Sequence, residues 1–478
     1  MSTSQIILGG SAGTNLDTAN PRYFLPMGMN QPSATESDIS CIVPTSGVFD
    51  NLKVLLRDSP GASKSYSTSL YKNGVEQSLN VTLSDSSTSG ADTSHPISVN
   101  AGDLISIGVT PSNTPTAVKM TFAMKFVPTA AGENIFMGAT TSITNGRYLS
   151  LCTFNGIHAA ALWSDIVFPT SGTVKKLYAS LNSAPALGNV SFITRKNTTD
   201  QSLVVTIANP STTGNDLSNN FSVVAGDYLS VRVGDSGGNG MGVKFSCVFL
   251  PDTLGEFVIP KTSEGANGDV TPGSTMYYSL SGGQVQFAPT EAIRQAVSCL
   301  SYTLKNLYVQ FEGFPGSGKS YTLTLRKNAG DQALAVTISN TNTNGNYATD
   351  ISIVDGDLLD TSVAASAGSS EYCFSTSYLG YIAPASTQPF LVFLFKDKNT
   401  AQQQATITWK GKTSLDPAIK TVYLQIFNRI SGLWETIDSD NSSPVNTDFT
   451  LTAIVSADLG DYFDANNWIS CRVYQELN

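Results

Sequence analysis

The sequence predicts an all-β protein made of several β-sandwiches, and three observations support this. Charged residues are 13% of the 478 residues and hydrophobic residues 41%. Ser, Thr, Asn and Gly replace the missing charges, a composition that suits short strands and polar turns better than exposed helices. Apolar residues alternate with a period of two, and no window of about 11 residues carries a helical stripe. A pattern also recurs along the chain at intervals of about 125–130 residues, which indicates tandem domains.

Each copy of the pattern contains a Lys-Asn pair, an alternating apolar segment and then a second strand with a Gly-Asp turn. The interval from the Asn to the Gly hardly changes between copies, so we expect the same local fold in each. The copies predict β-sandwiches at residues 1–128, 129–252 and 253–386. The pairs are Lys72-Asn73, Lys196-Asn197 and Lys327-Asn328, and the turns are Gly102-Asp103, Gly226-Asp227 and Gly356-Asp357. Glycine at a positive φ and an Asp that binds turn amides explain these turns structurally.

The last block, residues 387–478, departs from the repeat. Its strands are shorter and it is richer in Trp, so we predict a distinct, smaller C-terminal β-sandwich. The segment "PASTQP", residues 384–389, is typical of a linker.

The segment "GFPGSGKS", residues 313–320, matches the G-x-x-x-x-G-K-[ST] phosphate loop. A working phosphate loop precedes a helix whose free amides hold the phosphates, whereas "YTLTLRKN" follows here and alternates as a strand does. Residues 52–73 also align with 307–328 without a gap, and this first copy has Asp58 and Ser63 where the motif has its two glycines. We therefore interpret the motif as a Pro-Gly hairpin turn rather than a cofactor site. Its residues are Gly313, Gly318, Lys319 and Ser320.

Charge and segment length exclude several function classes. The net charge is −10 and Lys and Arg form no cluster, so we expect neither nucleic acid nor an anionic membrane as partner. No apolar stretch approaches the ~18 residues of a membrane span. The N-terminus has no basic and apolar signal region, and we expect folding in the cytoplasm.

Residue types that serve catalysis or metal binding are scarce. The six cysteines are far apart and lie in apolar runs, which is typical of buried free thiols. Only His95 and His158 could join them at a zinc site. The acidic residues recur mainly in turns. We predict no enzyme activity, no metal and no cofactor.

The tryptophans of the last block leave two interpretations open. Trp434 and Trp468 could stack on a sugar ring, as aromatic side chains do in sugar-binding sandwiches. Their period-two placement in "LWETI" and "NWISCRVYQ" equally suits the core of a small sandwich.

The strand–Gly-Asp–strand element resembles a hairpin of jelly-roll domains of the complement and tumour-necrosis-factor type. The tandem units, with their Ser-, Thr- and Gly-rich strands, resemble virion surface proteins of phages or large viruses, of the capsid-associated, spike or fibre type. This resemblance implies three tandem jelly-roll-like repeats and a non-enzymatic structural role in a virion that is assembled in the host cytoplasm. It also implies other virion proteins as partners and a homo-oligomer, with a trimer as the form to test first.

Two other function classes remain open. The first is a carbohydrate- or receptor-binding adhesin that uses the C-terminal domain to bind a surface glycan. The second is a nucleotide hydrolase, which would require residues 313–320 to bind phosphate.

Overall fold

The computed structural model describes residues 3–11, 13–186, 188–234, 240–262, 270–282, 287–369, 374–383, 391–396, 404–456, 458–464 and 467–475. The chain is all-β, as predicted, and divides into two compact units, Met1–Pro384 and Ala385–Asn478. We call them the N-terminal unit and the C-terminal unit. The predicted linker at 384–389 and Cys373 lie outside the described residues. Among the described residues, no helix is both long enough and apolar enough to span a membrane.

The N-terminal unit contains three pairs of sheets, and each pair takes its strands from one stretch of the chain. We call the pairs sandwich 1 (5–128), sandwich 2 (134–251) and sandwich 3 (256–381). The predicted boundaries at 128 and 252 stay predictions, because the two compact units do not divide this part of the chain further.

The elements of sandwich 1 are β1 (Gln5–Gly10), β2 (Arg22–Phe24), β3 (Gly28–Met29), α1 (Glu36–Ile39), β4 (Cys41–Ile42), β5 (Gly47–Leu56), β6 (Gly61–Lys72), β7 (Val75–Asp85), β8 (Ser89–Asp92), β9 (Ile97–Val99), β10 (Leu104–Ser112) and β11 (Met120–Pro128). Those of sandwich 2 are β12 (Asn134–Thr140), β13 (Tyr148–Leu149), β14 (Ile157–His158), the 3-10 helix η1 (Ala161–Trp163), β15 (Ile166–Val167), β16 (Gly172–Leu181), β17 (Asn189–Lys196), β18 (Thr199–Ala208), β19 (Thr213–Val223), β20 (Tyr228–Gly234) and β21 (Val243–Pro251). Those of sandwich 3 are β22 (Glu256–Lys261), β23 (Thr275–Tyr278), the 3-10 helix η3 (Glu291–Ile293), β24 (Ala296–Val297), β25 (Tyr302–Phe311), β26 (Gly316–Lys327), β27 (Gly330–Asn340), β28 (Asn344–Ile353), β29 (Leu358–Ala365) and β30 (Phe374–Tyr381).

The three sandwiches share one strand order. In sandwich 2 the sheets run β12-β21-β16-β19 and β13-β20-β17-β18, and in sandwich 3 they run β22-β30-β25-β28 and β23-β29-β26-β27. Sandwich 1 repeats this with β1-β11-β5-β8 and β2-β10-β6-β7. When the eight main strands of a sandwich are numbered along the chain, the orders are 1-8-3-6 and 2-7-4-5, the arrangement of a double-sheet jelly roll.

Burial along the third main strand of each sandwich shows why these sequences form sandwiches. Strands β5, β16 and β25 have the same alternation of buried and half-buried positions, including one interruption at the same place. The alternation directs Phe49, Val174 and Leu304 into their cores, where all three are fully buried. Burying one such side chain contributes about 1.5–3 kcal/mol, so a period of two is needed wherever one face of a strand meets the core.

The Lys-Asn pair and the Gly-Asp turn of each copy lie side by side. The amide of Asn197 donates to Asp227 (2.5 Å) and its carbonyl accepts from the backbone of Tyr228 (2.9 Å). Asn73 with Asp103, and Asn328 with Asp357, make the same contacts. The constant Asn–Gly interval therefore reflects a structural contact that ties two strands of one sheet to their turn.

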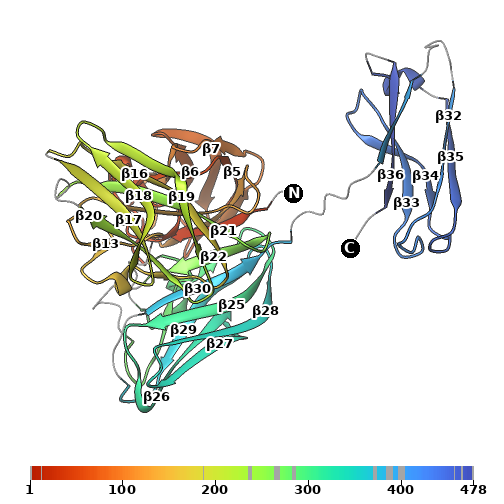
Figure 1. Ribbon diagram of the computed structural model, residues 1–478. Coiled ribbons are helices and arrows are strands. Elements are labelled where there is room, and N and C mark those ends of the chain that lie inside the picture. The colour runs from red at the N-terminus through yellow and green to blue at the C-terminus, as the bar shows by residue number, and fades with distance from the viewer. Residues whose placement is uncertain are drawn as a thin grey trace. The chain divides into compact units, whose positions relative to one another are not determined.

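The three sandwiches contact one another in a cycle, and Figure 1 shows them as the orange, yellow-green and teal parts of the N-terminal unit. Strand β4 of sandwich 1 contacts β21 of sandwich 2, β15 of sandwich 2 contacts β30 of sandwich 3, and β24 of sandwich 3 contacts β11 of sandwich 1. These strands hold equivalent places in the three sandwiches, so the unit is a ring with approximate threefold symmetry built from one chain. Buried apolar clusters run across the contacts; Ile6 and Leu8 of sandwich 1, for instance, belong to the core cluster of sandwich 3.

The C-terminal unit is a separate, smaller pair of sheets, as predicted. Its elements are β31 (Leu391–Lys396), β32 (Ala405–Gly411), β33 (Val422–Phe427), β34 (Trp434–Asp440), β35 (Phe449–Val455), the 3-10 helix η4 (Leu459–Tyr462) and β36 (Trp468–Gln475). The sheets run β31-β36-β33-β34 and β32-β35. Leu424, Ile426 and Leu451 lie in the core between them.

Candidate functional site

The segment that matches a phosphate loop lies at the start of strand β26. Gly313 precedes this strand, whereas Gly318, Lys319 and Ser320 are part of it. The described residues after the motif continue as a strand that pairs with β27 and β29, so this loop adjoins no helix N-terminus. The backbone N–H of Gly318 donates to the side chain of Asn340 (2.9 Å), so one amide that a phosphate would need is already bonded.

The aligned copy in sandwich 1 has the same turn. Ser63 has a φ of 59° and Gly318 a φ of 68°, and the Ser63 amide donates to Asp85 as that of Gly318 donates to Asn340. The predicted hairpin is wrong, however. Strand β25 and strand β26 belong to different sheets, so the Pro-Gly turn crosses from one sheet of sandwich 3 to the other. A short turn between two alternating segments looks the same in sequence whether the strands pair or face each other.

The two histidines lie in unrelated places. His95 is exposed and its Nδ1 lies 3.0 Å from the carboxylate of Asp92. His158 packs edge-on against Trp163, and burial lowers its pKa to about 4. Within the described part of the chain, no group of three or more His, Cys, Asp or Glu side chains could hold a metal ion. The five described cysteines are buried and free.

The two candidate tryptophans lie on the C-terminal unit, on strands of one sheet. Residues Val422, Leu424 and Ile426 of β33 point into the core, so the alternate residues Tyr423 and Phe427 occupy the other face of this sheet. We call that side the outer face. It also carries Trp434 of β34, Arg472 and Tyr474 of β36, and Trp468 at the start of β36 by the same alternation.

Cation–π contacts occupy part of this outer face. The guanidinium of Arg472 lies 4.4 Å from the centre of the Trp434 ring and 5.3 Å from that of Tyr474. The Phe427 ring packs against Trp434 at 5.2 Å. Trp434 is therefore half-buried outside the core, and Arg472 already covers one side of its indole. Trp409 instead packs against the core.

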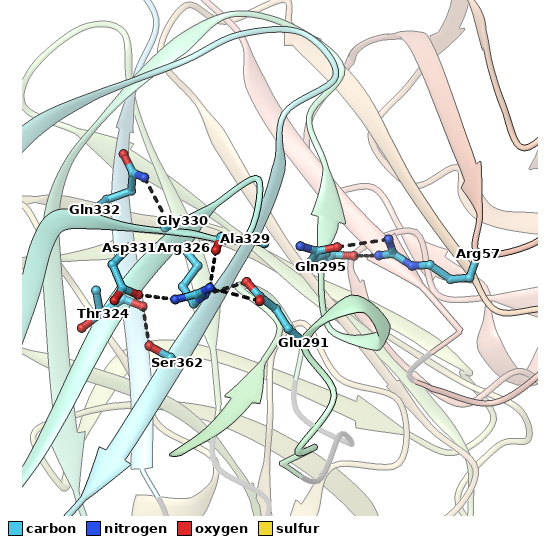
Figure 2. A network of polar contacts seen from close by, with 10 residues as sticks. All are labelled: Arg57, Glu291, Gln295, Thr324, Arg326, Ala329, Gly330, Asp331, Gln332 and Ser362. Atoms are coloured by element: carbon cyan, nitrogen blue, oxygen red, sulfur yellow. Dashed lines mark hydrogen bonds and ion pairs between the residues drawn. The ribbon is translucent and has the colours of Figure 1, made fainter.

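A cluster of charged side chains lies near the contact between sandwich 3 and sandwich 1 (Figure 2). Arg326 of β26 makes a two-pronged contact with Glu291 of η3, with Nε–Oε1 2.6 Å and Nη2–Oε2 3.1 Å, and also pairs with Asp331. Arg57, from the end of β5 in sandwich 1, donates to the backbone carbonyl and the side chain of Gln295. Residues far apart in the sequence thus close this contact.

Asp360 lies opposite Arg326 on strand β29 and is fully buried. As a carboxylate it finds no hydrogen-bond donor for either oxygen among the described residues. Burial, and then the neighbouring Glu291, raise the pKa of Asp360 to about 8. Near neutral pH Asp360 is thus a protonated acid that donates to Glu291. Burial also lowers the pKa of Arg57 to about 10, and this side chain stays charged near neutral pH. Two carboxylates and two guanidinium groups remain, so the cluster is neutral.

Perturbed carboxyl pairs occur both in active sites and in structural ion networks. No substrate can reach Asp360 because its side chain is completely buried, so we interpret the cluster as a structural ion network of sandwich 3, beside which Arg57 of sandwich 1 donates to Gln295. The sequence analysis missed it because its members come from separate elements. A lone Glu in a short helix and a lone Asp in a strand give no sequence signal of such a pair.

The variant Asp360→Asn should remove a pH dependence of stability. The folded-state pKa lies above the ordinary Asp value of about 3.9, so the folded chain holds a proton that the unfolded chain releases. Stability from this group is full at low pH and is lost as pH rises toward 8, at up to about 1.4 kcal/mol for each pH unit. Asn imitates the protonated acid and has no proton to lose. Urea unfolding between pH 5 and about 8.5 should show the wild type losing stability relative to the variant, and parallel curves would contradict the assignment.

Comparison with known proteins adds no relative. The sequence matches no protein-family model, and no curated protein matches it.

Proposed function

We propose that this chain is a non-enzymatic structural protein of a virus particle that acts through protein–protein assembly. The observation that carries the proposal is the single-chain ring of three jelly rolls, with a fourth, different sandwich appended. Double-sheet jelly rolls serve as capsid domains of viruses and as lectin domains. A ring of three also offers three similar outward surfaces, which suits docking at a repeated position on a particle.

The contacts within the ring change the oligomeric state that we propose for this chain. A trimer of separate chains would bury apolar faces between subunits, and here three sandwiches of one chain bury such faces against each other. We therefore propose that the partners are other virion proteins, and that a homo-oligomer would form through surfaces outside the ring contacts.

The test is to locate the chain in the infected or producing cell. Mass spectrometry of purified particles should find it at a fixed ratio to the major capsid protein through successive density-gradient steps. A chain that stays in the soluble fraction while particles sediment without it would overturn the proposal.

The second candidate is an adhesin that binds a glycan or receptor with the C-terminal unit. The observation in its favour is the outer face, where Trp434, Phe427 and Tyr474 lie outside the core with Arg472 between them. Trp, Tyr and Arg are the residues most enriched at binding hot spots. Full-length protein on a glycan array should then bind, and Trp434→Ala should abolish binding. Ile430→Ala, at a highly exposed apolar residue of the neighbouring loop, is the control that should not.

A further inference from the structure

A cavity of about 250 Å³ opens between sandwich 2 and sandwich 3. Sandwich 2 contributes the Gly226 turn and Tyr228, and sandwich 3 contributes Tyr308, Gln310 and Asn344. The volume lies just below the ~300–1,000 Å³ of sites for drug-sized ligands, so it suits one small ring rather than an extended chain.

The lining is polar and uncharged. The Tyr228 hydroxyl donates to the side-chain oxygen of Gln310 (2.7 Å), and the Asn344 side chain also reaches that hydroxyl. Burial raises the pKa of Tyr228, so the phenol stays neutral. The Tyr308 ring lies against Gly226, with Cε1 4.0 Å from where a Cβ would be. No lining residue carries a charge, which disfavours an ionic ligand.

The other two contacts of the ring provide an internal comparison. Tyr228 is the first residue of its strand after a Gly-Asp turn, and leucine holds that place in the other sandwiches, as Leu104 and Leu358. At the place of Tyr308, sandwich 2 also has a tyrosine, Tyr178, whereas sandwich 1 has Lys53, which pairs with Asp355 at 2.7 Å. The contact between sandwich 3 and sandwich 1 therefore forms without either tyrosine, and the two tyrosines occur together only at the contact between sandwich 2 and sandwich 3.

These side chains surround a cavity although the fold does not require them, and this favours a role in binding a ligand. Two aromatic rings suit the C–H face of a sugar, and primary amides both donate to and accept from neighbouring hydroxyl groups. We propose that this cavity binds a neutral saccharide ring between Tyr228 and Tyr308, with Gln310 and Asn344 bonding its hydroxyl groups. The site lies in the N-terminal unit, and it depends neither on the proposed virion role nor on the outer face of the C-terminal unit.

Saturation-transfer NMR on the full-length chain tests this, with glucose, galactose, N-acetylglucosamine and glucuronate offered separately at millimolar concentration. At least one of the three neutral sugars should receive saturation. Tyr228→Leu introduces the residue that the other two sandwiches tolerate, so the fold is retained, and the affinity should fall at least about tenfold. Gln310→Ser, the residue at this place in sandwich 2, should act in the same direction.

Two control variants locate the site. Tyr178→Ala, at the place of Tyr308 in sandwich 2, and Trp434→Ala, in the C-terminal unit, should leave the signal unchanged. The proposal fails if no neutral sugar receives saturation, if only glucuronate does, or if Tyr228→Leu binds as well as the wild type. Binding lost in Trp434→Ala but kept in Tyr228→Leu would also overturn it, and would favour the adhesin instead.

Discussion

Replacing Gly28 with alanine should destabilise the N-terminal unit far more than the same replacement at Gly102. Both glycines have a left-handed backbone, with φ of 87° and 97°, so an alanine at either pays about 1–2 kcal/mol of backbone strain. Their surroundings differ. A Cβ at Gly28 would lie 2.3 Å from the carbonyl oxygen of Cys152 and 2.8 Å from the Cα of Gly282, while a Cβ at Gly102 meets nothing within 4 Å.

The neighbours of Gly28 explain the size of the expected difference. Gly28 belongs to sandwich 1, Cys152 to sandwich 2 and Gly282 to sandwich 3, so the three sandwiches meet here backbone to backbone. A backbone atom cannot rotate away as the end of a side chain can, and overpacking of this kind costs typically a further 1–3 kcal/mol. We expect Gly28→Ala to lower the free energy of unfolding by about 2–5 kcal/mol.

Urea unfolding followed by circular dichroism measures both variants. Gly102→Ala is the matched control, because it has the same backbone strain without the crowding. Equal losses of stability in the two variants would mean that the sandwiches do not meet closely at Gly28. That result would contradict the ring arrangement of the three sandwiches.

Local features of this fold could be predicted from the sequence. The period of two placed Phe49, Val174 and Leu304 in cores, because burial of one face of a strand depends only on the strand itself. The constant interval between the Lys-Asn pairs and the Gly-Asp turns predicted the same local fold in each copy, and the structure adds that the Asn and the Asp bond to each other. The repeat also separated the phosphate-loop match from a phosphate site, since Ser63 and Gly318 occupy the same turn.

Features that depend on partners distant in sequence could not be predicted. Alternation does not say which strand pairs with which, so a turn between facing sheets was interpreted as a hairpin. The ring was also not predicted, because its third contact uses different residues from the first two. Thr45 donates to Glu133 and Thr170 to Glu256 at the first two contacts, whereas the third has Leu300 in the threonine's place. The cavity beside Tyr228 and Tyr308 depends on the same ring.

The third contact differs because no short linker joins its two sides. Sandwich 1 continues directly into sandwich 2, and sandwich 2 into sandwich 3, but sandwich 3 meets sandwich 1 only through non-covalent contacts. Asn51 donates to the backbone carbonyl of Cys299 (2.6 Å), and Arg57 donates to the backbone carbonyl and the side chain of Gln295. If the ring opens, it should open at this contact, because separating the other two leaves the sandwiches tethered.

Arg57→Met should therefore weaken the closure of the ring. Methionine keeps most of the side chain's apolar volume but removes the guanidinium, so Gln295 loses two hydrogen bonds from a charged donor. A hydrogen bond to a charged group contributes about 1.5–3 kcal/mol, and the bond to the Gln295 side chain is long (3.4 Å) and contributes less, so we expect a total loss of roughly 2–4 kcal/mol. Lys53→Met is the matched control at the same contact. Its partner Asp355 has a side chain 57% exposed, so this ion pair contributes at most about 1 kcal/mol.

Hydrogen exchange distinguishes opening of the ring from general destabilisation. In Arg57→Met, amides of β11 and β24, which face each other across the contact, should lose protection before those of β21 and β30 at the other two contacts. Lys53→Met should leave the order of exchange as it is in the wild type. Uniform loss of protection over all three sandwiches, or equal destabilisation by the two variants, would show that the contact between Arg57 and Gln295 does not hold the ring closed.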